Sequence, residues 1–188
     1  MRVIAGEAKG RSLVAPKGTG TRPATDRIRE TLFQILEPDL GEARVLDLFA
    51  GAGTMGIEAL SRGAAHATFV ERATPALDAL RKNVASTGFS GRSEIVGTNV
   101  IGFLDRGAPA QKYDFAFLDP PFADVAVLEA TLAHPNLALA LAPGATVIAR
   151  VLRKHPPAVP ASALIIRTKQ IGEEDLVFLR YSEPGGGG

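Results

Sequence analysis

The sequence has no cysteine, only three histidines and no long apolar run. The absence of cysteine excludes disulfide bonds and thiolate metal ligands, and three histidines far apart in the chain argue against a zinc site. No stretch of about 18 apolar residues is available to cross a membrane. The N-terminus also lacks the apolar segment of a signal peptide. We therefore expect a cytoplasmic protein that binds no metal ion.

What the sequence does contain is an ordinary composition with an uneven distribution of charge. Hydrophobic residues make up 46% and charged residues 22% of the 188 residues, which fits one globular domain. The net charge is +1, but residues 1–30 contain seven basic and three acidic side chains, so the rest of the chain is mildly acidic. Such a basic N-terminus either contacts nucleic acid or is simply solvated. We expect residues 1–23 to form a basic arm or a β-hairpin.

The hydrophobic pattern predicts a single α/β domain over residues 24–182. An amphipathic helix is expected at residues 25–36, with Pro38 just beyond its end. Strands and helices then alternate, which builds a parallel sheet with helices on both faces. The expected strands are residues 44–49, 67–71, 93–99, 113–119 and 145–151, followed by a closing hairpin at 163–171 and 175–182. The tail, residues 183–188, is expected to be disordered.

A glycine-rich loop lies between the first predicted strand and the helix after it. Gly51, Gly53 and Gly56 match the G-x-G-x-x-G pattern, in which the chain turns tightly and a helix N-terminus offers free N–H groups to a ligand. The pattern alone would equally fit a nicotinamide or flavin enzyme. Asp47, just before the loop, would repel a pyrophosphate and attract an amino group, and Glu71 suits the hydroxyls of a ribose. These two acids favour S-adenosylmethionine; the alternative is that Asp47 caps a turn and Glu71 is a solvated strand end.

The third predicted strand ends at Asn99, a polar residue on the same edge of the sheet. Its side chain would approach an adenine ring, or it is a turn residue that tolerates a left-handed backbone. We assign six residues to the cofactor site: Asp47, Phe49, Gly51, Gly53, Glu71 and Asn99.

The fourth predicted strand ends in an acid, two prolines and an aromatic ring: Asp119, Pro120, Pro121 and Phe122. A single proline would be enough to end a strand. Two prolines fix φ at successive residues and remove two N–H donors, so they make a rigid mount. The alternative is a rigid turn with a buried ring.

Several motifs resemble known families when they are taken in this order and spacing. DLFAGAG, VE and DPPF are similar to motifs of the class I S-adenosylmethionine-dependent methyltransferases, and the DPPF form to enzymes that methylate exocyclic amines of nucleobases. The segments RVIAGEAKGRSL, RPATDRIRETLFQIL and DLFAGAGTMGIEALSRGA resemble the RsmD family, the bacterial 16S ribosomal RNA guanine-N2 methyltransferases. The likeness runs from residue 2 to about residue 182, and RPATDRIRE is its most specific element.

The resemblance implies a Rossmann-like class I methyltransferase fold, with a seven-stranded, mostly parallel sheet, an antiparallel last strand and helices on both faces. It implies S-adenosylmethionine as the methyl donor and S-adenosylhomocysteine as the product. The implied partner is 16S ribosomal RNA in the small ribosomal subunit or its assembly intermediate, bound by a monomer. Asn99 departs from the common pattern, because related enzymes often carry an acid there.

For a guanine amine, the chemistry follows from the DPPF residues. The amine is a poor nucleophile until acceptors hold its protons, and the Asp119 carboxylate and the Pro120 carbonyl are two such acceptors. Phe122 offers a face on which the base stacks, worth roughly 1–3 kcal/mol. Alignment of the amine with the methyl group then supplies most of the rate. The candidates for phosphate contacts are Lys9, Arg11, Arg22 and Arg27.

Three other functions stay open at this point. A DNA or other amine methyltransferase would use the same pocket, although no target-recognition insertion is visible between residues 44 and 182. A nicotinamide reductase is favoured only by the glycine pattern. A ribosome-assembly factor without catalytic activity would keep the cofactor fold but would not need an intact DPPF motif.

Overall fold

The structure is a computed structural model that describes residues 1–16, 24–122 and 124–182. Its helices are α1 (Asp26–Leu40), α2 (Thr54–Ser61), α3 (Thr74–Thr87), the short 3-10 helix η1 (Ser90–Arg92), α4 (Val100–Leu104), α5 (Val125–Ala133) and α6 (Pro135–Ala140). Its strands are β1 (Arg44–Asp47), β2 (His66–Glu71), β3 (Ser93–Gly97), β4 (Tyr113–Leu118), β5 (Leu141–Leu152), β6 (Ala163–Ile171) and β7 (Glu174–Tyr181).

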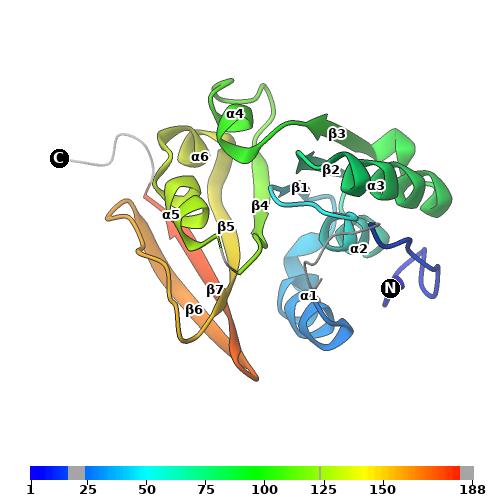
Figure 1. The fold of residues 1–188 in the computed structure, drawn as a ribbon, viewed down its shortest axis with the longest axis horizontal. Helices are drawn as coiled ribbons and strands as arrows, with labels where there is room; N and C mark the ends of the chain where they lie inside the picture. The colour runs from blue at the N-terminus through cyan, green and yellow to red at the C-terminus, as the bar shows by residue number, and fades with distance from the viewer. Residues whose placement is uncertain (17–23, 123, 183–188) are drawn as a thin grey trace.

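The seven strands form one sheet in the order β3-β2-β1-β4-β5-β7-β6 (Figure 1). The first five strands in that order are parallel, whereas β7 is antiparallel to both β5 and β6. The last strand of the chain therefore inserts between two earlier ones. This arrangement confirms the predicted fold class, including the closing hairpin and the antiparallel last strand.

Alternating side chains of each central strand serve two separate cores. In β4, Phe115 and Phe117 pack with α1, α2 and α3, whereas Ala116 and Leu118 face the core under α4, α5 and α6. Because successive side chains of a strand point to opposite faces, a near-continuous apolar run can satisfy both cores at once. The two groups of helices accordingly lie on opposite sides of the sheet (Figure 1).

Two local predictions were wrong. The first helix does not end before Pro38 but continues through it to Leu40, which is fully buried. The proline removes one backbone donor near the helix end, and the burial of Leu40 outweighs that loss. The short helix α6, residues 135–140, was not predicted, because its short and mostly apolar run has no helical periodicity.

The N-terminal segment, residues 1–16, packs against α2 and α3. An antiparallel bridge joins Arg2 to Ser12, and Val3, Ala8 and Leu13 are buried in the core under α1, α2 and α3. The described part of the segment is thus anchored to the sheet domain. The division of the chain into an arm at residues 1–23 and a domain at 24–182 stays a prediction, since residues 17–23, like the tail 183–188, lie outside the described residues.

Candidate active site

The carboxyl ends of three neighbouring parallel strands bring together Asp47, Glu71 and Asp119. Asp47 ends β1, where it pairs with Phe69 of β2 on one side and Phe117 of β4 on the other. Glu71 and Asp119 lie two residues beyond those partners. Because parallel strands end at the same edge of a sheet, the three acids share that edge, where ligands bind in open α/β sheets.

The glycine loop joins β1 to α2 and is held close to the sheet. Gly51 and Gly53 have φ of +53° and +83°, in the left-handed region that favours glycine. A Cβ on Gly53 would lie 2.4 Å from Leu80, and one on Gly56 would lie 2.3 Å from the ring of Phe69. Side chains at these two positions would therefore push α2 away from β2 and α3.

Asp47 is a buried carboxylate with one oxygen committed and one open. Its side chain is 1% exposed, and Oδ2 accepts a hydrogen bond from the N–H of Gly56 at 3.1 Å. Oδ1 is buried and has no hydrogen-bond partner among the described residues. Burial, reinforced by the negative charges of Asp119 and Glu71, raises the pKa of Asp47 to about 7. The turn-capping alternative thus describes only one of the two oxygens.

Glu71 binds the loop rather than pointing into solvent. Oε2 accepts from the N–H of Gly51 at 2.8 Å, and Oε1 accepts from the N–H groups of Arg72 and Ala73, each at 2.8 Å. A carboxylate offers about four lone-pair sites, so it can still accept from a ribose hydroxyl. Its part in binding a ribose stays a prediction, but Glu71 is not a solvated strand end.

Asn99 and Phe49 lie at the margins of this edge. Asn99 is exposed and caps α4, where Oδ1 accepts from the N–H of Gly102 at 2.8 Å. Its φ is −76°, so its backbone is not left-handed, but Asn99 does have a structural role, as the cap of α4. Phe49 is half-buried and packs against the core under α4, α5 and α6. An adenine contact by either residue stays a prediction.

The DPPF motif follows β4 and meets a residue that the sequence analysis did not select. Asp119 Oδ1 lies 2.8 Å from the Arg150 Nε in an ion pair, and the same Nε lies 3.6 Å from Glu174 Oε2. The Arg150 guanidinium also lies over the Phe122 ring, 4.6 Å from its centroid. Burial raises the pKa of Asp119 to about 6; Arg150 opposes that shift and Glu174 adds to it.

The two prolines play different parts in the turn. Pro120 is buried and Pro121 is exposed, and the Pro121 carbonyl accepts the N–H of Asp124 at 2.8 Å. A shallow depression beside Phe122 is lined by the last three residues of the motif, the start of α5, the end of β5 and His155, which follows β5. The ring is half-buried, so the alternative of a buried ring in a rigid turn describes it only in part.

Arg150 could have been suspected from the sequence, whereas Glu174 could not. Arg150 is a charged residue within the apolar run of residues 145–151, and its side chain is 5% exposed. A buried arginine needs a partner, so its position implies an acid nearby. Glu174 is 24 residues further along the chain, and only the insertion of β7 beside β5 brings it close.

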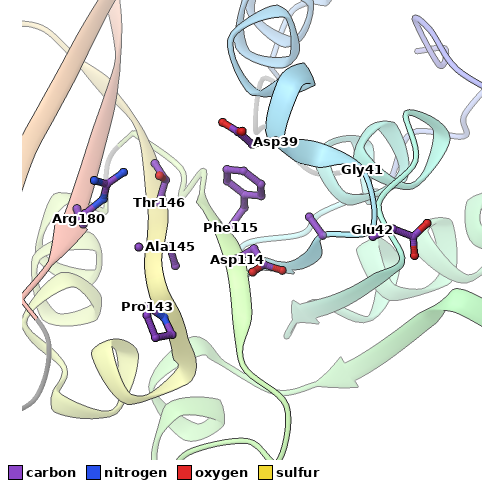
Figure 2. Close-up of a pocket in the computed structure, with 11 residues that line it drawn as sticks. Asp39, Gly41, Glu42, Asp114, Phe115, Pro143, Ala145, Thr146 and Arg180 are labelled. Carbon is purple, nitrogen blue, oxygen red and sulfur yellow. The ribbon is translucent and has the colours of Figure 1, made fainter.

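A larger cavity, of about 360 Å³, lies at the opposite edge of the sheet (Figure 2). It is lined by the starts of β4 and β5 and the loop before β1, with Asp39, Glu42, Asp114, Thr146 and Arg180 around it. None of the predicted site residues lines it. We assign the candidate active site to the other edge, because the conformationally special glycines and the perturbed carboxyl groups lie there.

The predicted RNA-binding residues are spread over the N-terminal segment and α1. Lys9 and Arg27 are exposed, and Arg11 is exposed but donates a hydrogen bond from Nη1 to the Ser86 carbonyl. Arg22 lies outside the described residues. Arg29, which contributes to the basic charge of this region, is 1% exposed and pairs with Asp26 at 2.7 Å and with Glu58 at 3.5 Å. Its charge is therefore neutralised inside the protein.

Among the described residues, no group of three or more histidine, cysteine or acidic side chains could hold a metal ion. No helix in the same residues is long and apolar enough to cross a membrane.

Comparisons with known proteins identify the family to which the chain belongs. Residues 1–180 match the family model described as Conserved hypothetical protein 95. The chain is 33% identical over 177 residues to the Ribosomal RNA small subunit methyltransferase D of Haemophilus influenzae, and the match covers 92% of this chain and 89% of the relative. It is 44% identical over 123 residues to the protein of the same name from Escherichia coli, where the match covers 65% of this chain and 60% of the relative. The chain thus covers less than two thirds of that relative's length.

A solved structure supports the same relationship. The structure of yhhF from Escherichia coli, described as a methyltransferase, superposes with a TM-score of 0.83 at 35% identity, covering 98% of this chain and 99% of the other. The family model covers nearly the whole chain, and the Haemophilus influenzae relative is matched over most of both lengths. The resemblance found in the sequence is therefore confirmed: the chain belongs to the Conserved hypothetical protein 95 family, the RsmD family of S-adenosylmethionine-dependent methyltransferases.

Proposed function

We propose that the protein transfers a methyl group from S-adenosylmethionine to the exocyclic N2 amine of a guanine in 16S ribosomal RNA. The observation that carries the proposal is the position of Asp119: it leads the DPPF motif and lies two residues beyond Phe117, the β4 partner of Asp47. One edge of the sheet thus joins a glycine-loop ligand site to a site for an amine. The names of the relatives supply the class of RNA.

The residues at this edge fit the cofactor. Asp47 Oδ1 is a buried acceptor without a partner among the described residues, which suits the ammonium group of an amino-acid end. Glu71 suits the ribose, and Asn99 and Phe49 border the place expected for the adenine. Three carboxylates at one edge favour a ligand that carries positive charge. When bound, the cofactor supplies an electrophilic methyl group on a sulfonium.

The residues of the DPPF motif fit the target base. The Asp119 carboxylate and the Pro120 carbonyl accept hydrogen bonds from the two N–H groups of the amine, which localises its lone pair. Phe122 stacks against the base, and the prolines hold all three groups in place. In the transfer, a nitrogen–carbon bond forms as the carbon–sulfur bond breaks, and the cationic amine then releases one proton to Asp119 or to water.

The base has to leave any helical stack before it reaches this pocket, which costs little in a loop of RNA. We assign the phosphate contacts to Lys9, Arg11, Arg22 and Arg27, which would position the RNA without reading its sequence. The small ribosomal subunit or its assembly intermediate is the proposed partner in the cytoplasm, and a monomer is the proposed state of the enzyme.

The test uses small-subunit particles from a strain that lacks this protein. The particles are incubated with the protein and labelled S-adenosylmethionine, and the modified nucleotide is mapped by nuclease digestion and mass spectrometry. Label in N2-methylguanine of 16S RNA is the expected result. Label in adenine, or only in added DNA, would refute the proposal and point to another amine methyltransferase. Binding of the cofactor without any transfer would favour an assembly factor.

A further inference from the structure

Arg150 of β5 contacts both the acid and the aromatic ring of the candidate base site. A single guanidinium contacts the acid of the DPPF motif, through the 2.8 Å ion pair with Asp119, and its ring, through the 4.6 Å approach to Phe122. Glu174 of β7 approaches the same Nε at 3.6 Å. Arg150 is thus held between β4 and β7 while it touches both ends of the motif.

Packing does not explain an arginine at this position. On the same face of the sheet, Ile148 and the cross-strand partner Leu176 are buried in the apolar core, and Arg150 itself is 5% exposed. A buried guanidinium is unfavourable unless acids and an aromatic face replace its hydration. Those partners are Asp119, Glu174 and Phe122, and two of the three belong to the candidate active site.

We propose that Arg150 is a positioning residue for the target base, which fixes the Asp119 carboxylate and the Phe122 ring and is itself held by Glu174. The inference rests on the function proposed above. Arg150 would bind Oδ1 of Asp119 and leave Oδ2 as the acceptor for the amine. It would also cover one face of the Phe122 ring and leave the other face for the base.

Removal of the Arg150 charge and removal of the Glu174 charge should shift the pKa of Asp119 in opposite directions. Arg150 lowers the pKa of Asp119, whereas Glu174 raises it, with burial as the largest cause of the net rise to about 6. Three other ionisable groups lie around this site: Asp47 from β1, Asp124 just before α5 and His155 after β5. Removal of the arginine should therefore move the titration of Asp119 to higher pH, and removal of the Glu174 charge should move it to lower pH.

The experiment compares Arg150→Gln, Arg150→Lys and Glu174→Gln with a matched control, Arg153→Gln. Arg153 follows the same strand but pairs with Asp175 at 3.0 Å and is 42% exposed. The first readout is the single-turnover methylation rate from about pH 5 to about pH 9, together with cofactor affinity. The second is the carboxyl carbon-13 shift of Asp119 in the cofactor-free protein, which does not depend on activity.

For Arg150→Gln we expect the rate at neutral pH to fall about tenfold to a hundredfold, with cofactor affinity nearly unchanged. The acid limb of the rate and the carboxyl titration should both move to higher pH. Arg150→Lys should return both toward wild type while the rate stays low, because lysine keeps the charge but not the planar fork. Glu174→Gln should move both to lower pH, and Arg153→Gln should move neither.

The inference is wrong if the Asp119 titration is the same in wild type and Arg150→Gln, or if the Arg150→Gln and Glu174→Gln variants shift it in the same direction. Should Arg150→Gln fail to fold, Arg150→Lys and Glu174→Gln still decide the sign. A wild-type protein that transfers no methyl group would refute the proposed function instead, and the carboxyl titration would still test the role of Arg150.

Discussion

Glu58, beneath the N-terminal segment, and Asp47, at the carboxyl edge of the sheet, are both almost completely buried, yet their surroundings differ. Glu58 accepts hydrogen bonds from the backbone N–H groups of Ile4 and Ala5 and from the guanidinium groups of Arg29 and Arg62. Asp47 accepts one, from Gly56, and the charges acting on it are those of other acids. The same chemical group is saturated in one region and left open in the other.

The difference distinguishes a carboxylate that stabilises the fold, Glu58, from one that is available to bind a ligand, Asp47. A buried carboxylate with donors on both oxygens and two cations stabilises the structure around it, here the contact of the N-terminal segment with α1 and α2. A buried carboxylate without a cation is unfavourable until a ligand supplies one, and such groups gather at functional sites. Asp119 is intermediate, since Arg150 binds it but its pKa is still raised.

The largest expected effect comes from Asp119→Ala. This change removes the acceptor for the amine, so the rate of methyl transfer should fall at least about a thousandfold, while cofactor affinity changes little. Single-turnover assays and calorimetric titration of the cofactor measure the two effects. Asp39→Ala, an exposed acid beside the cavity at the opposite edge, is the matched control and should keep full activity. Substantial turnover by Asp119→Ala would remove Asp119 from its assigned role.

Glu58→Gln should have the next largest effect, and on stability rather than chemistry. It leaves Arg29 and Arg62 without their shared buried partner, which costs about 3 kcal/mol in the free energy of unfolding. Urea unfolding measures this loss. Glu37→Gln is the control: Glu37 also reaches Arg62, at 3.8 Å, but is 63% exposed, so its loss should matter by less than about 0.5 kcal/mol. An equal loss of unfolding free energy in the two variants would show that the buried hydrogen bonds of Glu58 do not account for its contribution to stability.

The fold was predictable because one kind of signal repeats along the whole chain. Apolar runs alternate with amphipathic helices, and this alternation has few solutions other than a parallel sheet with two covered faces. The misses concern one helix end and one short helix, where tertiary burial outweighs local preference. Leu40 reaches the core and carries α1 past Pro38, and α6 forms in a run without helical periodicity.

The sequence predicted only those site residues that lie at the ends of strands. Asp47, Glu71 and Asp119 could be found that way, whereas Arg150 and Glu174 meet through the insertion of β7, which no local pattern encodes. Counting charges misled in the N-terminal region, because Arg29 is neutralised within the protein. Charge in a sequence reports on partners only after internal pairs are subtracted.

Asp47→Asn tests the open carboxylate directly and should have an effect opposite in sign to Glu58→Gln on stability. The pKa of Asp47 is raised above its unfolded value, so the stability it contributes is present at low pH and is lost as pH rises through about 7. A neutral amide removes that loss, so the cofactor-free variant should melt at a higher temperature at pH about 8. A lower melting temperature than wild type would contradict the description of Asp47 as an open, unfavourable charge.

The same variant should bind the cofactor about tenfold more weakly at alkaline pH, because an amide replaces the charge that meets the ammonium group. In wild type, affinity should rise as pH increases through about 7, where Asp47 loses its proton. That rise should disappear in Asp47→Asn. Calorimetric titrations across the pH range measure both effects, and an unchanged pH dependence in the variant would place the ammonium group elsewhere.

The smallest expected effect is on RNA binding, and it extends the comparison to the basic residues. Lys9 and Arg27 are exposed, unlike Arg29, so they are free to meet phosphates. Replacing both with alanine should weaken RNA binding about tenfold at low salt and reduce the slope of log affinity against log salt by about one to two, since each phosphate contact releases counterions. Cofactor affinity should not change. The double variant Arg81→Ala with Lys82→Ala, which removes two charges from α3, is the control. If it weakens binding as much, the RNA responds to net charge alone and the N-terminal region has no special part in holding it.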